Sequence, residues 1–197
     1  MTKYILNSGG AKNYPDLAKK FLAEIVKNLG NNPRFLICYF AQPREDWDKK
    51  FSEDKEGRFK MFPEGVIPVF ELAFPETFEE QIKNSDVVYI HGGDDYLLQY
   101  WLRQFNIPKI WEGKIIATSS AGSDALSKYF WTCDLRKCVD GLAILPIKFL
   151  PHYKSSYGSE DSRGHIDWNK ALQELKGYKK NLPIHALKEG EYIIIES

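Results

Sequence analysis

The fold is decided by a stretch in the middle of the chain, KIIATSSAG at residues 114–122. Residues 114–118 are mostly apolar and typical of a strand, and the serines and small residues after them lead into a helical pattern. A strand that turns sharply into a helix is characteristic of an α/β protein. Ligands of such proteins bind at the carboxyl ends of the strands, which is where Ser119 and Ser120 stand.

The same alternation extends in both directions from this stretch. Helical patterns separate the strands, and the first of them repeats apolar residues at Leu17, Phe21, Ile25 and Leu29. Strands are predicted at residues 3–7, 34–40, 65–73, 86–90, 114–118, 142–149, 183–187 and 191–196. This order predicts an α/β fold with a mostly parallel, doubly wound sheet. The sequence has no internal repeat, low-complexity tract or linker, so a single domain over residues 1–197 is expected.

The composition argues against several classes of partner. The 27 basic and 27 acidic side chains cancel, so binding to nucleic acid through counterion release is not indicated. The longest apolar runs fall far short of the roughly 20 residues that cross a bilayer. The first residues lack a signal-peptide pattern, and the three cysteines form no Cys-x-x-Cys pair, which fits a reducing compartment. We therefore expect a cytoplasmic protein with no nucleic-acid or membrane partner.

The serines after the fifth strand allow two roles. In a nucleophile elbow the serine is exposed on a sharp turn, and the small residues Ala121 and Gly122 leave room for it. Backbone N–H groups at the start of the helix can then stabilise an oxyanion. A serine at this position is also a common N-cap. Because Thr118 replaces the first glycine of Gly-x-Ser-x-Gly, the motif alone leaves both roles open.

A second segment at a strand end contains His91, Gly92, Gly93, Asp94 and Asp95. The paired glycines let the backbone approach a ligand and could complete an oxyanion hole. The alternative is a tight turn in which one aspartate caps the next helix. A metal site is disfavoured, because hard-ligand sites need more converging oxygens than one turn supplies. Neither Gly-x-Gly-x-x-Gly nor a P-loop lysine is present, which argues against nucleotide binding.

A nucleophilic serine needs a base, and the chain has four histidines. His152 is favoured, because Pro151 restricts the backbone before it and the imidazole can emerge at the end of an extended segment. His91 is the main alternative. His185 falls inside a short apolar strand and His165 inside a polar loop, so both are less suited.

The third group should be a carboxylate that orients the imidazole. Glu189 and Asp134 are both candidates, and spacing alone does not choose between them. The order Ser120, Asp134, His152 would also suit an esterase or amidase of the α/β-hydrolase kind. The region between Ser120 and His152 is, however, too short for the strand–helix units that usually intervene there.

Four segments together resemble the dipeptidase E and cyanophycinase family of serine peptidases. They are the strand–Gly-Gly–helix segment, the Ser-Ala-Gly elbow, the Pro-His pair and the Leu-x-Glu-Gly turn, at residues 88–98, 120–122, 151–152 and 187–190. They occur in the family's order, and the resemblance covers nearly the whole chain. It implies a three-layer αβα sandwich similar to the class I glutamine amidotransferases, in which a cysteine takes the place of the serine.

The resemblance also implies roles for individual residues. Ser120 would be the nucleophile, His152 the general base and then acid, and Glu189 the orienting carboxylate, with Asp134 as the other candidate for this third position. The oxyanion hole would use backbone N–H groups of Gly92, Gly93 and Ala121. No metal or organic cofactor is implied.

The expected function is therefore that of a serine peptidase, a monomer or homodimer that hydrolyses short peptides through an acyl-enzyme. Two departures bear on the substrate. Asp94 stands where dipeptidase E has asparagine, and Asp167 or Trp168 stands where it has a substrate-binding arginine. An aspartyl preference therefore does not follow. The alternatives are a non-catalytic small-ligand-binding protein on the same scaffold and an esterase or amidase.

Overall fold

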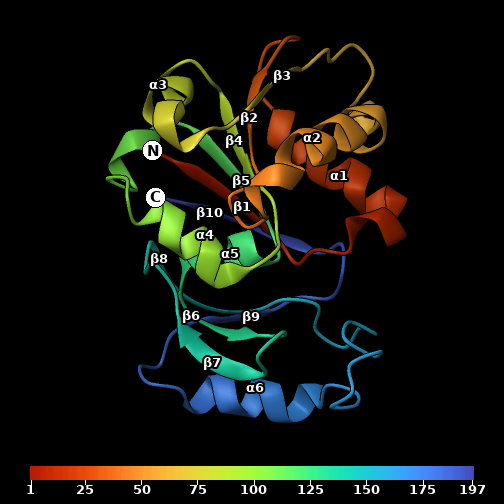
Figure 1. Ribbon diagram of the computed structural model, residues 1–197, viewed down its shortest axis with the longest axis vertical. Helices are drawn as coiled ribbons and strands as arrows, with labels where there is room; N and C mark the ends of the chain where they lie inside the picture. The colour runs from red at the N-terminus through yellow and green to blue at the C-terminus, as the bar shows by residue number, and fades with distance from the viewer.

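The larger of two sheets has six strands in the order β10-β1-β5-β4-β2-β3 (Figure 1). The computed structural model describes residues 1–197 apart from the side chains of Arg58 and Phe59. The strands are β1 (Lys3–Asn7), β2 (Arg34–Cys38), β3 (Val69–Leu72), β4 (Val87–Ile90), β5 (Ile115–Ser119) and β10 (Tyr192–Glu196). The first five are mutually parallel where they pair, and β10 pairs antiparallel to β1. The predicted, mostly parallel sheet is confirmed.

Helices cover both faces of this sheet, which gives the three predicted layers. In Figure 1, α1 and α2 lie on one side and α3 and α4 on the other. The helices are α1 (Pro15–Val26), α2 (Trp47–Glu56), α3 (Phe78–Lys83), α4 (Asp95–Leu102) and α5 (Ala121–Leu126). The apolar face of α1 buries Phe21, Leu22 and Ile25, as its helical periodicity predicts. Leu29 lies beyond the end of that helix and still packs against the core.

A second sheet was not foreseen as a unit. Its strands have the order β7-β6-β8-β9 and are β6 (Ser127–Thr132), β7 (Lys137–Asp140), β8 (Leu145–Leu150) and β9 (Ile184–Ala186). The sequence analysis predicted extended chain at β8 and β9 and missed β6 and β7. Helix α6 (Trp168–Gly177) packs on this sheet through Ala171 and Leu175. In Figure 1 the two lie below the larger sheet.

Strand register places three connecting segments at one edge of the larger sheet. Asn7 of β1 pairs with Ser119 of β5, and Ile90 of β4 pairs with Thr118. Because these strands are parallel and end at the same level, the residues after each of them emerge together. The edge therefore collects residues 8–10, the turn at residues 91–93 and Ser120.

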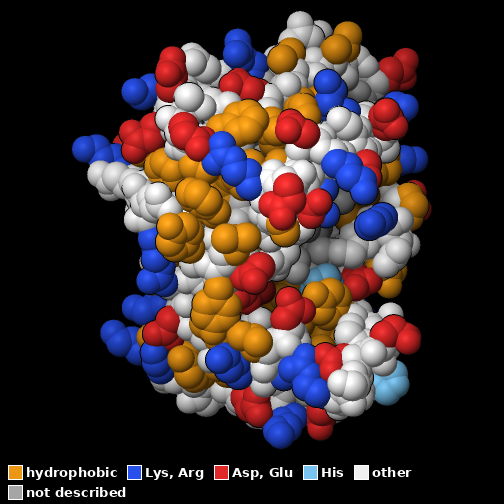
Figure 2. All heavy atoms as spheres, viewed as in Figure 1, with side chains coloured by type: hydrophobic (Ala, Val, Ile, Leu, Met, Phe, Trp, Pro, Cys, Tyr) orange, Lys and Arg blue, Asp and Glu red, His pale blue; other side chains and the backbone are white. Residues whose placement is uncertain are grey.

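The surface and the helices agree with the even charge balance of the sequence. Figure 2 shows basic and acidic side chains interspersed over the visible face, with no extended patch of one sign. Within the described residues, every helix is too short or too polar to cross a lipid bilayer.

Truncation of the core side chain on α1 should destabilise the fold. Phe21 is 2% exposed and contacts the rings of Tyr89 and Tyr192. Phe21→Ala should lower the free energy of unfolding by about 3–5 kcal/mol, because it removes buried apolar surface and leaves a cavity. Urea denaturation measures this change. Lys19→Ala, at an exposed position of the same helix, is the control, and an equal effect of the two substitutions would contradict the packing described.

Candidate active site

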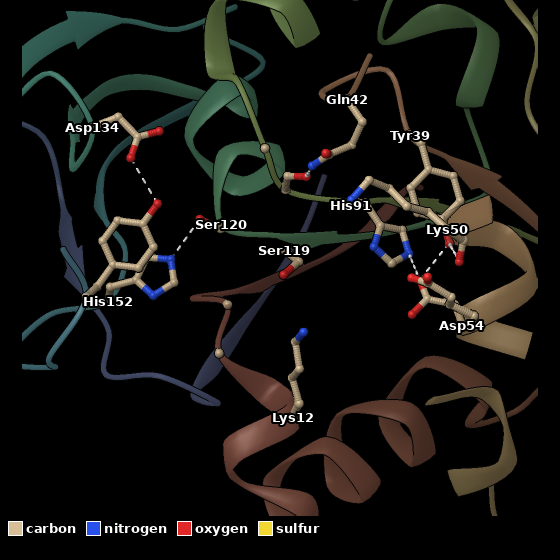
Figure 3. Close-up of a pocket in the computed structure, with 16 residues that line it drawn as sticks. Lys12, Tyr39, Gln42, Lys50, Asp54, His91, Ser119, Ser120, Asp134 and His152 are labelled. Carbon is tan, nitrogen blue, oxygen red and sulfur yellow. Dashed lines mark hydrogen bonds and ion pairs between the residues drawn. The ribbon is translucent and has the colours of Figure 1, made fainter. Parts of the chain in front are cut away.

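A cavity of about 370 Å³ opens at the edge where β1, β4 and β5 end. Its lining includes the glycines after β1, the glycines after β4, and Ser120 after β5 (Figure 3). His152 lies on one side of the cavity, and His91, Asp54 and Lys50 lie on the opposite side. Tyr157, stacked on the ring of His152, also lines the cavity. The cavity thus contains residues of both segments that the sequence analysis selected.

Ser120 occupies a strained turn between β5 and α5. Its φ and ψ are 50° and −114°, in a region that residues with a side chain seldom adopt. Hydrogen bonds hold the turn, since Ser120 N–H donates to Asn7 O at 2.9 Å and Ser123 N–H donates to Ser120 O at 2.8 Å. The Ser120 side chain makes no capping bond to the helix. The side-chain N-cap alternative is therefore wrong for Ser120.

Ser120, His152 and Glu189 form a hydrogen-bonded series. Ser120 Oγ lies 2.9 Å from His152 Nε2, and His152 Nδ1 lies 3.0 Å from Glu189 Oε1. His152 follows the end of β8 and is 5% exposed. The structure thus brings together the three residues that the sequence analysis named for a triad, although they lie on separate segments of the chain.

The loop after β1 fixes the positions of His152 and Glu189. Ser8 Oγ accepts the N–H of His152 at 2.6 Å and donates to Leu187 O at 2.8 Å. A Cβ atom on Gly9 would lie 2.7 Å from His152 Cε1, and one on Gly10 would lie 2.5 Å from Glu189 Cδ. Both glycines also have positive φ. The sequence analysis did not select this loop, although two glycines directly after a strand are a signal for a close backbone approach.

Asp134 is connected to the site through Tyr157 and not through a hydrogen bond to the imidazole. Tyr157 donates its hydroxyl to Asp134 Oδ1 at 2.9 Å, and its ring stacks on that of His152 with centroids 4.1 Å apart. Glu189, and not Asp134, is the carboxylate hydrogen-bonded to the imidazole. The geometry therefore favours Glu189 as the third member. Tyr157 was not foreseen, because a single tyrosine in a polar loop carries no pattern.

Among the described residues, His152 is the histidine hydrogen-bonded to Ser120. His91 Nε2 lies 3.2 Å from Asp54 Oδ2, and its ring stacks on Tyr39 across the cavity from His152 (Figure 3). His185 lies on β9, and His165 lines a different cavity.

The glycine turn after β4 lies directly against the elbow. A Cβ atom on Gly92 would lie 2.9 Å from Ser119 O and 3.0 Å from Ser120 Cβ. Within the described part of the chain, the N–H groups of Gly92, Gly93 and Ala121 donate no hydrogen bond. Asp94 caps α4 by accepting the Leu97 N–H at 2.8 Å. The capping role of Asp94 is therefore observed.

The electrostatics of His152 suit a base. Burial lowers the pKa of the imidazole, and the hydrogen bond and negative charge of Glu189 oppose this shift. The net direction is below the ordinary histidine pKa of about 6.5. At neutral pH the ring is therefore mainly uncharged and able to accept a proton from Ser120.

A three-layer α/β fold with a serine, a histidine and a carboxylate in series at a strand-to-helix turn defines a serine hydrolase. The sequence matches the model of Peptidase family S51 over residues 4–197, so the chain belongs to that family and is a serine-type peptidase. This confirms the resemblance to the dipeptidase E family.

Two solved structures share the fold. A peptidase from an acI-B1 Actinobacterium is 19% identical with a TM-score of 0.67, over 99% of this chain and 83% of that one. A candidate peptidase E protein from Listeria monocytogenes EGD-e is 18% identical with a TM-score of 0.68, over 99% of this chain and 94% of that one. The sequence comparison with curated proteins gave no match.

Substitution of Gly10 should break the contact between His152 and Glu189. In Gly10→Ala the added methyl group would displace the Glu189 side chain, so the far-downfield proton resonance of a hydrogen-bonded His152 Nδ1–H should disappear from the NMR spectrum. Gly113→Ala is the matched control, because Gly113 also has positive φ but nothing within 4 Å of the added carbon. Persistence of the resonance in Gly10→Ala would contradict the positioning role of the loop.

Proposed function

We propose that this peptidase hydrolyses short peptides through an acyl-enzyme on Ser120. The observation that carries the proposal is the contact of 2.9 Å between Ser120 Oγ and His152 Nε2, on an imidazole that Glu189 orients. A serine becomes nucleophilic when a neighbouring base accepts its proton during attack. Ser120 lines the cavity, and its side chain makes no capping bond to α5.

The proposed reaction has two halves. In the first, His152 Nε2 takes the Ser120 proton as Oγ attacks the peptide carbonyl, and the resulting imidazolium is stabilised by Glu189. The oxyanion accepts hydrogen bonds from the N–H groups of the glycine turn and of Ala121. His152 then protonates the leaving amine. In the second half, His152 activates a water molecule that hydrolyses the ester and regenerates Ser120.

The size and lining of the cavity support a small substrate. A volume of about 370 Å³ lies at the lower end of the range for small-ligand sites, about 300–1,000 Å³. The lining contains Lys12 and Lys50 as well as Glu53 and Asp54. Side chains of both signs suit a zwitterionic ligand such as a free short peptide.

The two departures from dipeptidase E have structural explanations. Asp94 is engaged in capping α4. Asp167 caps α6 by accepting the N–H groups of Asn169 and Lys170, and Trp168 Nε1–H donates to Ser155 O. Neither Asp167 nor Trp168 lines the cavity. An aspartyl preference therefore gains no support from these positions.

The esterase alternative depended on the chain order Ser120, Asp134, His152, and the structure does not favour Asp134 in that series. The α/β-hydrolase order needs the carboxylate before the histidine, and the candidate in that place, Asp134, is hydrogen-bonded to Tyr157. The carboxylate on the imidazole is Glu189, which follows His152 in the chain.

Removal of the nucleophile should abolish activity. The native protein should hydrolyse members of a dipeptide panel and react with a fluorophosphonate at Ser120. Ser120→Ala should lose at least about 10³-fold in rate and keep its melting temperature. Ser52→Ala, at an exposed position on α2, should behave as the native protein does. Hydrolysis by Ser120→Ala at the native rate would overturn the proposal. A folded native protein that neither hydrolyses the dipeptides nor reacts with the fluorophosphonate would also overturn it and would favour a ligand-binding protein.

The pH profile should reflect the lowered pKa of His152. Since the neutral imidazole is the reactive form, the rate of serine labelling should rise with pH through a midpoint below about 6.5. Glu189→Gln removes a group that raises this pKa, so the midpoint should move to still lower pH, and the maximal rate should fall by as much as about 10⁴-fold. Asp134→Asn should lower the maximal labelling rate much less than Glu189→Gln does. A greater loss in Asp134→Asn than in Glu189→Gln would contradict the assignment of the third member.

A further inference from the structure

The glycine turn beside Ser120 has a hydrogen-bond partner outside the triad. Gln42 Nε2 donates to Gly92 O at 2.6 Å from the segment after β2 (Figure 3). The Gln42 backbone is itself fixed, since its N–H donates to Tyr39 O at 2.8 Å and its carbonyl accepts Trp47 Nε1–H at 2.9 Å. The Gln42 side chain therefore extends from a fixed backbone position to the glycine turn.

The turn is confined on two sides. A Cβ atom on Gly92 would lie 3.0 Å from Ser120 Cβ, and one on Gly93 would lie 2.2 Å from Ala41 O and 2.3 Å from Gln42 Nε2. Asp94 N–H also donates to Ala41 O at 2.8 Å. The segment at residues 41–42 thus packs against the glycines, which lie against the elbow through Gly92.

Glycine has no side chain to restrict φ and ψ, so the orientation of the Gly92–Gly93 peptide depends on the contacts that its own groups make. In a trans peptide the C=O and N–H groups point in opposite directions. The bond from Gln42 fixes the Gly92 carbonyl and, with it, the direction of the Gly93 N–H, which donates no hydrogen bond within the described residues. Rotation of this peptide by half a turn would exchange the two groups and point a carbonyl oxygen where the donor now points. Glycine adopts such alternative conformations at little cost.

We propose that Gln42 is a positioning residue that holds the Gly92–Gly93 peptide in the orientation that presents its N–H group to the oxyanion. The inference rests on the proposed function and adds a residue that the sequence analysis did not consider. Its chemical requirement is specific: the side chain must donate a hydrogen bond to Gly92 O. A residue of the same shape that only accepts hydrogen bonds should favour the rotated peptide.

The test compares two substitutions by the kinetics of fluorophosphonate labelling of Ser120. Gln42→Glu keeps the shape and replaces the donor with a carboxylate that repels the Gly92 carbonyl. Gln42→Met only removes the donor. At pH 8 the maximal labelling rate should fall about tenfold or more in Gln42→Glu and less in Gln42→Met, with half-saturating reagent concentrations close to native. Direct loss of one oxyanion donor, on the order of 10²–10³-fold, is the upper limit. Gln104→Glu, on the surface, should label as the native protein does.

The outcomes separate the inference from the proposed function. A native labelling rate in Gln42→Glu would overturn the positioning role while the function stands. A change confined to the half-saturating concentration, or equal losses in both variants, would also overturn it. If Gln42→Glu does not fold, Gln42→Met decides, since a reduced maximal rate with a native melting temperature supports the role and a native rate overturns it. A native protein that is not labelled would refute the function and the role of Gln42 together.

Discussion

The site depends on the close contact between the backbone after β1 and the two residues that activate the serine. Gly9 and Gly10 pass so near to His152 and Glu189 that neither position has space for a Cβ atom. Ser8 adds hydrogen bonds to His152 N–H and Leu187 O, and Gly190 N–H donates to Gly9 O. One loop thus holds both the imidazole and its carboxylate against the end of β5, where Ser120 is located.

The two sheets together position the residues that make this contact. The matched ends of β1, β4 and β5 bring the loop, the glycine turn and the elbow to one edge of the larger sheet, while the second sheet delivers His152 at the end of β8. Ser120 and His152 both have positive φ, a conformation that costs of order 1–3 kcal/mol per residue and persists where surrounding contacts impose it. The hydrogen bonds of Ser8 and Asn7 to these backbones are such contacts.

Local patterns in the sequence predicted the larger sheet, its helices and the candidate serine, because alternating strands and helices and the Ser-Ala-Gly turn are local signals. The roles of His152 and Glu189 were implied by the family resemblance, and the residues alone left His91 and Asp134 as alternatives. The choice between Glu189 and Asp134 required coordinates, since both are carboxylates at turns and only the fold decides which one contacts His152 Nδ1. The partners that position the site, Ser8 and Gln42, act on residues 144 and 50 positions away. A helical or strand repeat relates only residues that are near in sequence, so it cannot predict contacts between residues this far apart. Strand β6 follows α5 directly without a clear turn signal, which is why it was missed, and β7, which pairs with β6, was missed with it.

The most direct test of the account is a crystal structure of the protein after reaction with a fluorophosphonate. The account predicts phosphorus bonded to Ser120 Oγ, with the phosphoryl oxygen within hydrogen-bond distance of the N–H groups of Ala121 and the glycine turn, and Gln42 still bonded to Gly92 O. An adduct on another residue, or a phosphoryl oxygen directed to solvent away from these donors, would contradict it.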